Sequence, residues 1–189
     1  MKPIVISRSR FPRLLFPCSL AAALLVLFSM ALAQEPAQNS ADVQRQAMRE
    51  LSFLADRWSG PVSVVRGPGE PLHLAQTESL QYKLDGLVLL IEGQSTGSDG
   101  KVMFSALATI SYDDASRTYR FRAYNGGHYL DTELSVPDNG FSWQFQAGPA
   151  HIVNTMHLTN QGEWSEETEA TFGNNPPHRS VDMLLQHLP

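Results

Sequence analysis

The feature that most constrains the fold is an alternation of apolar and polar side chains, with a period of two, that begins near Trp58 and continues toward the C-terminus. From Val102 to Ile110 every second residue is apolar, and Phe141, Trp143 and Phe145 alternate with polar residues. Successive side chains of a strand point to opposite faces of a sheet, so each such segment can bury one face. Nine clusters of Gly, Pro, Asn and Asp interrupt the alternation and delimit ten segments, each long enough for one strand.

Ten short strands joined by tight turns predict an all-β fold, an antiparallel up-and-down β-barrel of about ten strands. Closure of the sheet removes the exposed edge strands, which otherwise pair with other chains. An open sandwich of two sheets is the structural alternative that the pattern leaves open. The barrel is expected to occupy residues 57–189.

One amphipathic helix is predicted before the barrel. Apolar residues recur at helical spacing, and Asn39 or Ser40 can cap the first turn; the repeating positions are Val43, Ala47, Leu51, Leu54 and Trp58. We therefore expect a helix over residues 41–56. With the polar, proline-containing lead that precedes it, this helix forms a segment at 34–56.

The first 33 residues have the three parts of a cleavable secretory signal peptide. Four basic residues precede an apolar run, and Ala31-Leu32-Ala33 gives the small-x-small pattern of a cleavage site. The strongly apolar part, from Ser19 to Ala33, is about 15 residues long, whereas a spanning helix needs about 20. The sequence thus predicts an exported protein, periplasmic or secreted, with no stable membrane span after cleavage.

Processing would change both the cysteine content and the charge of the chain. The single cysteine, Cys18, lies within the signal peptide, so the mature chain would contain no disulfide, thiolate metal site or cysteine nucleophile. Ten basic and nineteen acidic residues follow Ala33, which gives a net charge of −9 in place of −5. Such a field repels phosphate backbones, so we expect no binding to nucleic acid.

Several short motifs resemble the calycin superfamily, which includes lipocalins and fatty-acid-binding proteins. Trp58-Ser59-Gly60 follows a leucine-rich turn, as at the mouth of the first calycin strand, and Tyr112-Asp113 precedes an aromatic strand. Gly162-Glu163-Trp164 near the end also fits. The chain is most similar to small bacterial calycin-like domains of unknown function, and more distantly to nitrobindins. The resemblance implies a barrel of eight or ten strands with a cavity, and it does not imply one activity.

An aromatic and methionine-rich set on the alternating face supplies the candidate ligand-binding residues. Burial of apolar ligand surface against such a lining stabilises a complex, and one polar group can fix the orientation. The candidates are Phe104, Tyr119, Phe121, Trp143, Phe145, Met156, Trp164 and Met183. Glu166 shares the parity of Trp164, so an inward carboxylate opposite Arg120, Arg122 or Arg179 is a possible polar anchor. The leading hypothesis is a small apolar or amphipathic ligand, and a solidly packed interior is the alternative.

Trp58 and His187 are expected to close one end of the barrel. In an antiparallel barrel with an even number of strands, the start of the first strand lies beside the end of the last, which brings these two residues together. We expect no cofactor. Nitrobindin-like barrels bind haem through a histidine followed by leucine near the C-terminus, so the resemblance implies haem bound through His187 as the alternative.

No motif identifies a catalytic residue or a metal site. His151 and His157 lie six residues apart on one predicted strand, about 20 Å at the rise of a strand, which is too far to chelate one ion. The chain contains no Gly-x-Ser-x-Gly elbow and no His-Glu-x-x-His helix. We therefore expect a binding protein rather than an enzyme, with a protein-interaction module that lacks a ligand as a further alternative; the oligomeric state is open.

Overall fold

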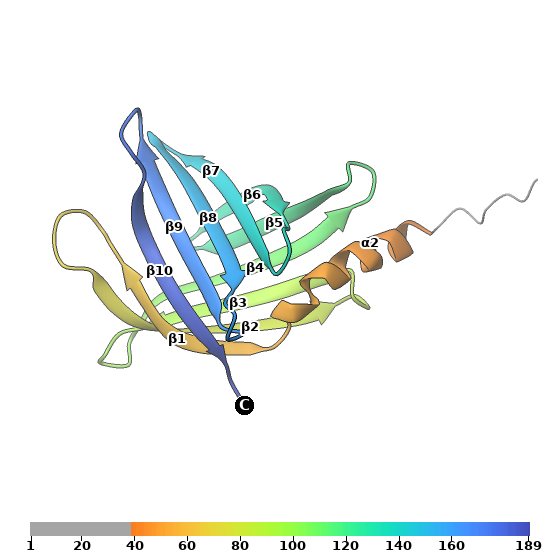
Figure 1. The fold of residues 1–189 in the computed structure, drawn as a ribbon, viewed down its shortest axis with the longest axis horizontal. Coiled ribbons are helices and arrows are strands. Elements are labelled where there is room, and N and C mark those ends of the chain that lie inside the picture. Colours follow the sequence, from red (N-terminus) through yellow and green to blue (C-terminus); the bar gives the residue numbers. More distant parts are fainter. Residues whose placement is uncertain (1–38) are drawn as a thin grey trace, which may run out of the picture. The chain divides into compact units, whose positions relative to one another are not determined.

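The computed structural model describes residues 39–189. The predicted signal peptide, with Cys18, and most of the lead lie outside the described residues. The described chain forms one helical segment followed by a closed barrel of ten antiparallel strands (Figure 1), which confirms the predicted fold class. The strands are β1 (Arg57–Val64), β2 (Leu72–Lys83), β3 (Val88–Thr96), β4 (Val102–Asp113), β5 (Thr118–Asn125), β6 (His128–Ser135), β7 (Gly140–Ala147), β8 (Ala150–Leu158), β9 (Trp164–Phe172) and β10 (His178–His187).

Each strand pairs with its neighbours in sequence, and β10 returns to pair with β1, so the alternative of an open sandwich is wrong. The closing pair sets Trp58 opposite His187 and Val62 opposite Met183. Gly60, the glycine of the Trp-x-Gly motif, is needed at this junction, because a Cβ there would overlap the carbonyl oxygen of Leu184. The motif thus belongs to the closure of the sheet.

The helical segment begins with the α-helix α2 (Ser40–Met48) and continues as the 3₁₀ helix η1 (Arg49–Leu54). Asn39 is the N-cap: its side-chain oxygen accepts a hydrogen bond from the backbone N–H of Ala41 at 3.2 Å. The sequence predicts a continuous helix over 41–56, but the second half is wound more tightly and ends two residues earlier. In a 3₁₀ helix, residues three apart line up, and this turns both Leu51 and Leu54 into the core.

The helical segment covers one end of the barrel, which we call the packed end (Figure 1). The Tyr82 hydroxyl donates to the carbonyl of Met48 at 2.5 Å, and the Tyr119 hydroxyl donates to that of Ala47 at 2.7 Å. These two hydrogen bonds join β2 and β5 to the end of α2, and they fix the segment on the barrel. Beneath it lies an apolar core made of Met48, Leu51, Leu54, Trp58, Leu80, Leu89, Ile110, Met156 and Leu185.

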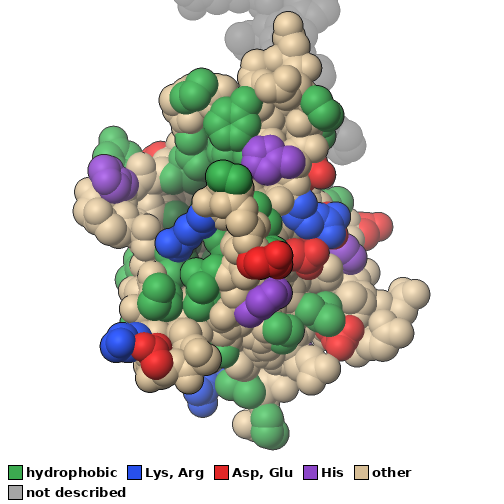
Figure 2. Space-filling model, turned by 90° about the vertical axis from the view of Figure 1, so that its left-hand side faces the viewer, with side chains coloured by type: hydrophobic (Ala, Val, Ile, Leu, Met, Phe, Trp, Pro, Cys, Tyr) green, Lys and Arg blue, Asp and Glu red, His purple; other side chains and the backbone are tan. Residues whose placement is uncertain are grey.

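The opposite end carries the turns that follow β1, β3 and β9, and among residues 39–189 no helix covers it. Large apolar side chains are exposed on the strand segments next to these turns: Leu72, Val102, Met103, Phe104 and Phe172. Figure 2 views the molecule from this side and shows apolar side chains gathered among histidine and charged groups. We call this the open end. None of the helices within residues 39–189 combines the length and the apolar character that a membrane span requires.

Candidate binding site in the barrel interior

Two adjoining cavities of about 220 Å³ and 280 Å³ lie inside the barrel. They share four lining residues, Glu78, Phe104, Trp143 and Glu166, and we call the two together the chamber. The cavity of 220 Å³ is otherwise lined by Ile91, Gly93, Ala106, Ala108, Phe121, Ala123, Asn125, Leu130, Phe141 and Trp164. The other adds Val62, Val64, Arg66, Leu74, Gln76, Ser95, Asn154, Thr168, Val181 and Met183.

Five of the eight candidate ligand-binding residues line the chamber: Phe104, Phe121, Trp143, Trp164 and Met183. Phe121 and Trp143 stack at a centroid distance of 5.2 Å. The other three lie elsewhere. Met156 is buried in the core, Tyr119 bonds to the helical segment, and Phe145 lies half-buried toward the open end, where its ring contacts Trp143. The structure therefore gathers most of the set around one space.

A polar group enters the chamber from β2 and β3. The side-chain amide of Gln76 donates to Oε1 of Glu78 at 2.6 Å, and the Ser95 hydroxyl donates to the side-chain oxygen Oε1 of Gln76. Gln76 and Ser95 are both buried. Ser95 therefore fixes the orientation of the Gln76 amide, so that its NH₂ group faces the carboxyl group of Glu78.

A second polar group enters from β8 and β9. Glu166 accepts two hydrogen bonds, at 2.8 Å from the amide of Asn154 and at 2.8 Å from the indole N–H of Trp164. The Asn154 amide also donates to the Thr168 hydroxyl at 3.0 Å. Each oxygen of the Glu166 carboxyl group thus has one donor.

Two buried acceptor atoms in the chamber have no hydrogen-bond partner: Oε2 of Glu78 and Oδ1 of Asn154. Buried polar atoms are usually paired, and an unpaired one costs about 1–3 kcal/mol. The carboxyl group of Glu78 has its own space in the sheet, because Gly93 lies opposite it and a Cβ there would be 2.6 Å from Oε1 and 2.8 Å from Oε2. These oxygens are thus accommodated by the fold and left available inside it.

Both chamber carboxyl groups hold their protons more tightly than exposed ones do. Burial, with the nearby charge of Glu166, raises the pKa of Glu78 from 4.5 to about 8, against the opposing effect of the Gln76 hydrogen bond. Burial also raises the pKa of Glu166, although the hydrogen bonds from Asn154 and Trp164 lower it. Desolvation disfavours the ionised form of a carboxyl group, so near neutral pH the empty chamber keeps Glu78 largely uncharged.

The expectation that an arginine pairs with Glu166 is wrong, although Glu166 does point inward. Arg120 and Arg122 both pair with Asp131 on the outer surface. Arg179 pairs with Glu167 and with Asp182, the latter at 2.9 Å. Arg120 and Arg122 have the opposite parity to the inward residue Phe121 of β5. Arg179 shares the parity of the inward Met183, but a β-bulge between Arg179 and Val181 shifts the register of β10, and Arg179 reaches outer carboxylates as well. Arg66, an exposed residue just after β1, is the cation that lines the chamber among the described residues.

Trp58 and His187 lie together at the packed end, and their surroundings do not fit haem ligation by His187. Their ring centroids are 3.5 Å apart, Trp58 is fully buried, and the Trp58 indole N–H donates to the carbonyl of Leu54 at 2.9 Å. Nδ1 of His187 lies 3.4 Å from Oδ2 of Asp56. The ring is thus covered on one face, and His187 lines neither cavity of the chamber. Within residues 39–189, no three His, Cys, Asp or Glu side chains gather as a metal site.

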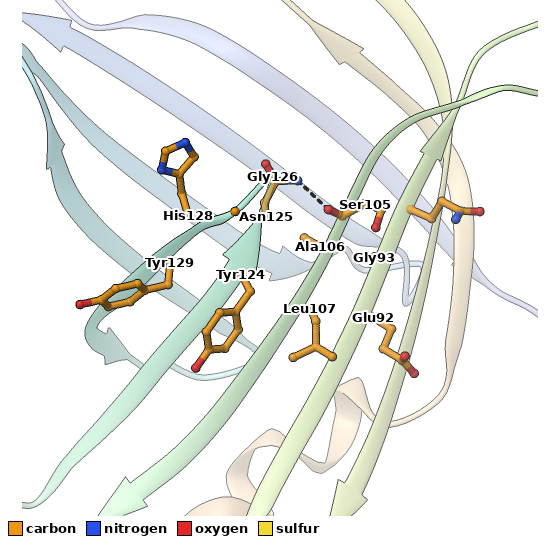
Figure 3. A pocket seen from close by; sticks show the side chains of 12 residues that line it. Glu92, Gly93, Ser105, Ala106, Leu107, Tyr124, Asn125, Gly126, His128 and Tyr129 are labelled. Atoms are coloured by element: carbon orange, nitrogen blue, oxygen red, sulfur yellow. Dashed lines mark hydrogen bonds between the residues drawn. The ribbon is translucent and has the colours of Figure 1, made fainter.

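A groove of about 800 Å³ lies on the outside of the barrel (Figure 3), and it shares Gly93, Ala106 and Asn125 with the lining of the 220 Å³ cavity. Glu92, Leu107, Tyr124 and Tyr129 form a row across β3, β4, β5 and β6, each directly paired with the next. Tyr129 is 74% exposed. The Asn125 side chain donates to the carbonyl of Ser105 at 2.5 Å at one edge of the groove. This surface is aromatic and open to solvent, unlike the chamber.

The sequence interpretation did not identify Gln76, Glu78 and Asn154 as site residues, although the signal that places them inside is simple. Gln76 and Glu78 share the parity of Leu74 and Leu80 on β2, and Asn154 shares that of Met156 on β8. If the inward parity of the apolar residues is also applied to the polar residues of the same strands, all three fall inside the barrel.

The comparisons with known proteins bear on the fold. No protein-family model matches this sequence, and no curated protein matches it. Among solved structures, the chain is similar to the crystal structure of Rv2717c from M. tuberculosis, with a TM-score of 0.57 and 13% sequence identity. The match covers 76% of this chain and 98% of that one. At this identity the likeness establishes a common barrel fold and nothing of the activity.

Proposed function

We propose that this chain is an exported, calycin-like binding protein that holds a small amphipathic molecule in the chamber. The observation that carries the proposal is the composition of the chamber, in which aromatic and aliphatic side chains surround a few buried polar groups. Binding sites for small molecules have this composition. The exposed apolar residues at the open end provide a path by which such a molecule can enter. Export rests on the predicted signal peptide at residues 1–33.

The proposal is supported by the contrast between the chamber and the rest of the interior. If side chains filled the barrel completely, the buried acceptors without partners would destabilise the fold and could not contact any ligand. Small polar and apolar residues such as Ala106, Ala108 and Ser95 leave space in the middle of the barrel, whereas large residues fill the packed end.

The test is binding of the neutral fluorescent probe N-phenyl-1-naphthylamine to the processed protein, with native mass spectrometry to detect any molecule retained from the cell. We expect saturable fluorescence enhancement in the wild type and its loss in Ala108→Phe, which fills the chamber. Ala115→Phe, in the exposed turn between β4 and β5, is the matched control and keeps the binding. A wild-type protein that gives no enhancement and only the bare polypeptide mass contradicts the proposal.

The alternative of an interaction module stays a prediction, and the outer groove is the surface that it would use. Exposed tyrosines are frequent at protein interfaces. A Tyr129→Ser variant that loses self-association or partner binding, while probe binding in the chamber is unchanged, would favour this alternative.

A further inference from the structure

We propose that the polar head of the chamber's ligand is a cationic amine, held between the carboxyl groups of Glu78 and Glu166 within the aromatic lining. This inference rests on the proposed function and adds the chemical class of the ligand. It follows from the hydrogen-bonding capacity that the chamber leaves unused, from its charge and from its walls.

When Glu78 is ionised, the buried side-chain atoms of the chamber that lack a hydrogen-bond partner are both acceptors. Oε2 of Glu78 and Oδ1 of Asn154 are buried and have no partner, and Asn154 is only 2% exposed. The amide donors of the same cluster are already engaged: the Gln76 amide with Glu78, and the Asn154 amide with both Glu166 and Thr168. A ligand that completes the cluster with Glu78 ionised must therefore bring N–H or O–H donors. An ammonium group carries three donors and no acceptor.

The charge of the chamber points the same way. Glu78 and Glu166 face one space, and the titratable or charged groups that line it are these two and Arg66 from the turn after β1. Neither glutamate forms an ion pair with Arg66. Once ionised, two carboxyl groups that have no ion-pair partner repel an anionic head group, whereas a cation between them supplies the missing counter-charge.

The walls suit a cation next to an apolar body. Trp143 and Trp164 line the same space as the two glutamates, together with Phe104 and Phe121. The faces of aromatic rings attract cations, most strongly when water is excluded. Cavities of about 220 and 280 Å³ accommodate an arylalkyl amine. The uncharged aromatic side chains of the lining bury the ring of such a ligand.

Binding of an amine would change the protonation of the site. The raised pKa of Glu78, about 8, means that the empty chamber holds a proton near neutral pH. An ammonium group beside Glu78 stabilises the ionised form, so the proton leaves to solvent as the ligand enters. The affinity for an amine should therefore rise as the pH increases from 6 toward 8, while the affinity for a neutral analogue should not.

The experiment compares 2-phenylethylamine with 2-phenylethanol, which differs only in the head group, by calorimetry and by quenching of tryptophan fluorescence in the processed protein. Because hydrogen bonds to charged groups are the stronger class, we expect the wild type to prefer the amine by at least about tenfold. Glu78→Gln should abolish that preference and the pH dependence of amine binding, while leaving the alcohol unaffected. Glu169→Gln, an outward-facing change on β9, is the control and keeps the preference.

The outcomes separate the two proposals. If the alcohol binds as tightly as the amine, the chamber is a binding site but the inferred amine class is wrong. If Glu78→Gln retains the preference, Glu78 does not hold the amine and the proposed placement of the head group is wrong. If neither phenyl probe nor N-phenyl-1-naphthylamine binds, the proposed function fails and the amine inference fails with it. Circular dichroism of Glu78→Gln shows whether the variant is folded, and the pH dependence of amine binding to the wild type tests the inference independently of any variant.

Discussion

The packed end and the chamber are two halves of one barrel interior built on opposite principles. At the packed end, Leu51, Leu54, Trp58 and Leu89 are all fully buried, and the helical segment covers them. A few residues further along the same strands, the inward positions hold glutamate, glutamine and asparagine around empty volume. Apolar burial stabilises a fold, whereas desolvated carboxyl groups and unpaired acceptors destabilise it. The packed end therefore carries the stability, and the chamber retains costly groups that have a use only if something binds.

The largest expected effect comes from a truncation at the packed end. Trp58→Ala should lower the free energy of unfolding by about 3–5 kcal/mol, because it leaves a cavity among fully buried neighbours. Tyr129→Ala, on the outer surface, should change it by no more than about 0.5 kcal/mol. Urea unfolding followed by circular dichroism measures both. Equal losses in the two variants would remove the distinction between the packed end and the surface.

The next effect concerns pH and comes from the chamber. The pKa of Glu78 is about 8 in the folded protein and near its ordinary value of 4.5 once unfolded. Between these values the folded state binds a proton that the unfolded state has lost, so stability is present below pH 4.5 and is lost as the pH rises through 8. The loss is on the order of a few kcal/mol.

Thermal unfolding from pH 5 to pH 9 measures this dependence. The melting temperature of the wild type should fall more steeply with rising pH than that of Glu78→Gln, whose amide does not ionise. Glu169→Gln, which lies outside, should follow the wild type. Parallel curves for Glu78→Gln and the wild type would mean that the chamber does not raise the pKa of Glu78.

A smaller effect distinguishes filled from empty space. Leu89→Trp inserts atoms into a packed site, which typically costs about 1–3 kcal/mol. Ala108→Phe inserts a ring where the chamber has room, and its cost should be less than about 1 kcal/mol because the ring buries apolar surface there. Chemical denaturation of the two variants under the same conditions provides the comparison. A larger loss for Ala108→Phe than for Leu89→Trp would show that the chamber is closed by packing.

The smallest effect concerns the attachment of the helical segment. Tyr82→Phe removes one hydrogen bond to the carbonyl of Met48, and should cost about 0.5–1.5 kcal/mol. Tyr119→Phe removes the corresponding bond to Ala47. Hydrogen exchange should accelerate at the amides of residues 40–54 and stay unchanged on β8 and β9. Acceleration spread evenly over the barrel would mean that the segment and the strands unfold as one unit.

The chamber illustrates how far local patterns reach. Alternation placed Phe121, Trp143, Trp164 and Glu166 on one face of their strands, and the structure brings these four around one space. It did not distinguish Tyr119, which shares that face but lies under the helical segment. Position along the barrel axis separates the two groups, and that position depends on how the strands are staggered, which the alternation does not encode.

The sequence by itself determined the ten strands, their antiparallel order and the helical segment before them, because period, turn residues and capping act within a few neighbouring residues. Only the tertiary structure decided that Glu78 from β2 and Glu166 from β9 would share one desolvated space, with Gly93 of β3 giving room to the Glu78 carboxyl group. Those strands are not neighbours in the sheet; they meet because β10 closes on β1 and curves the sheet around them. Desolvation and charge coupling arise from that closure, since both depend on distances across the barrel.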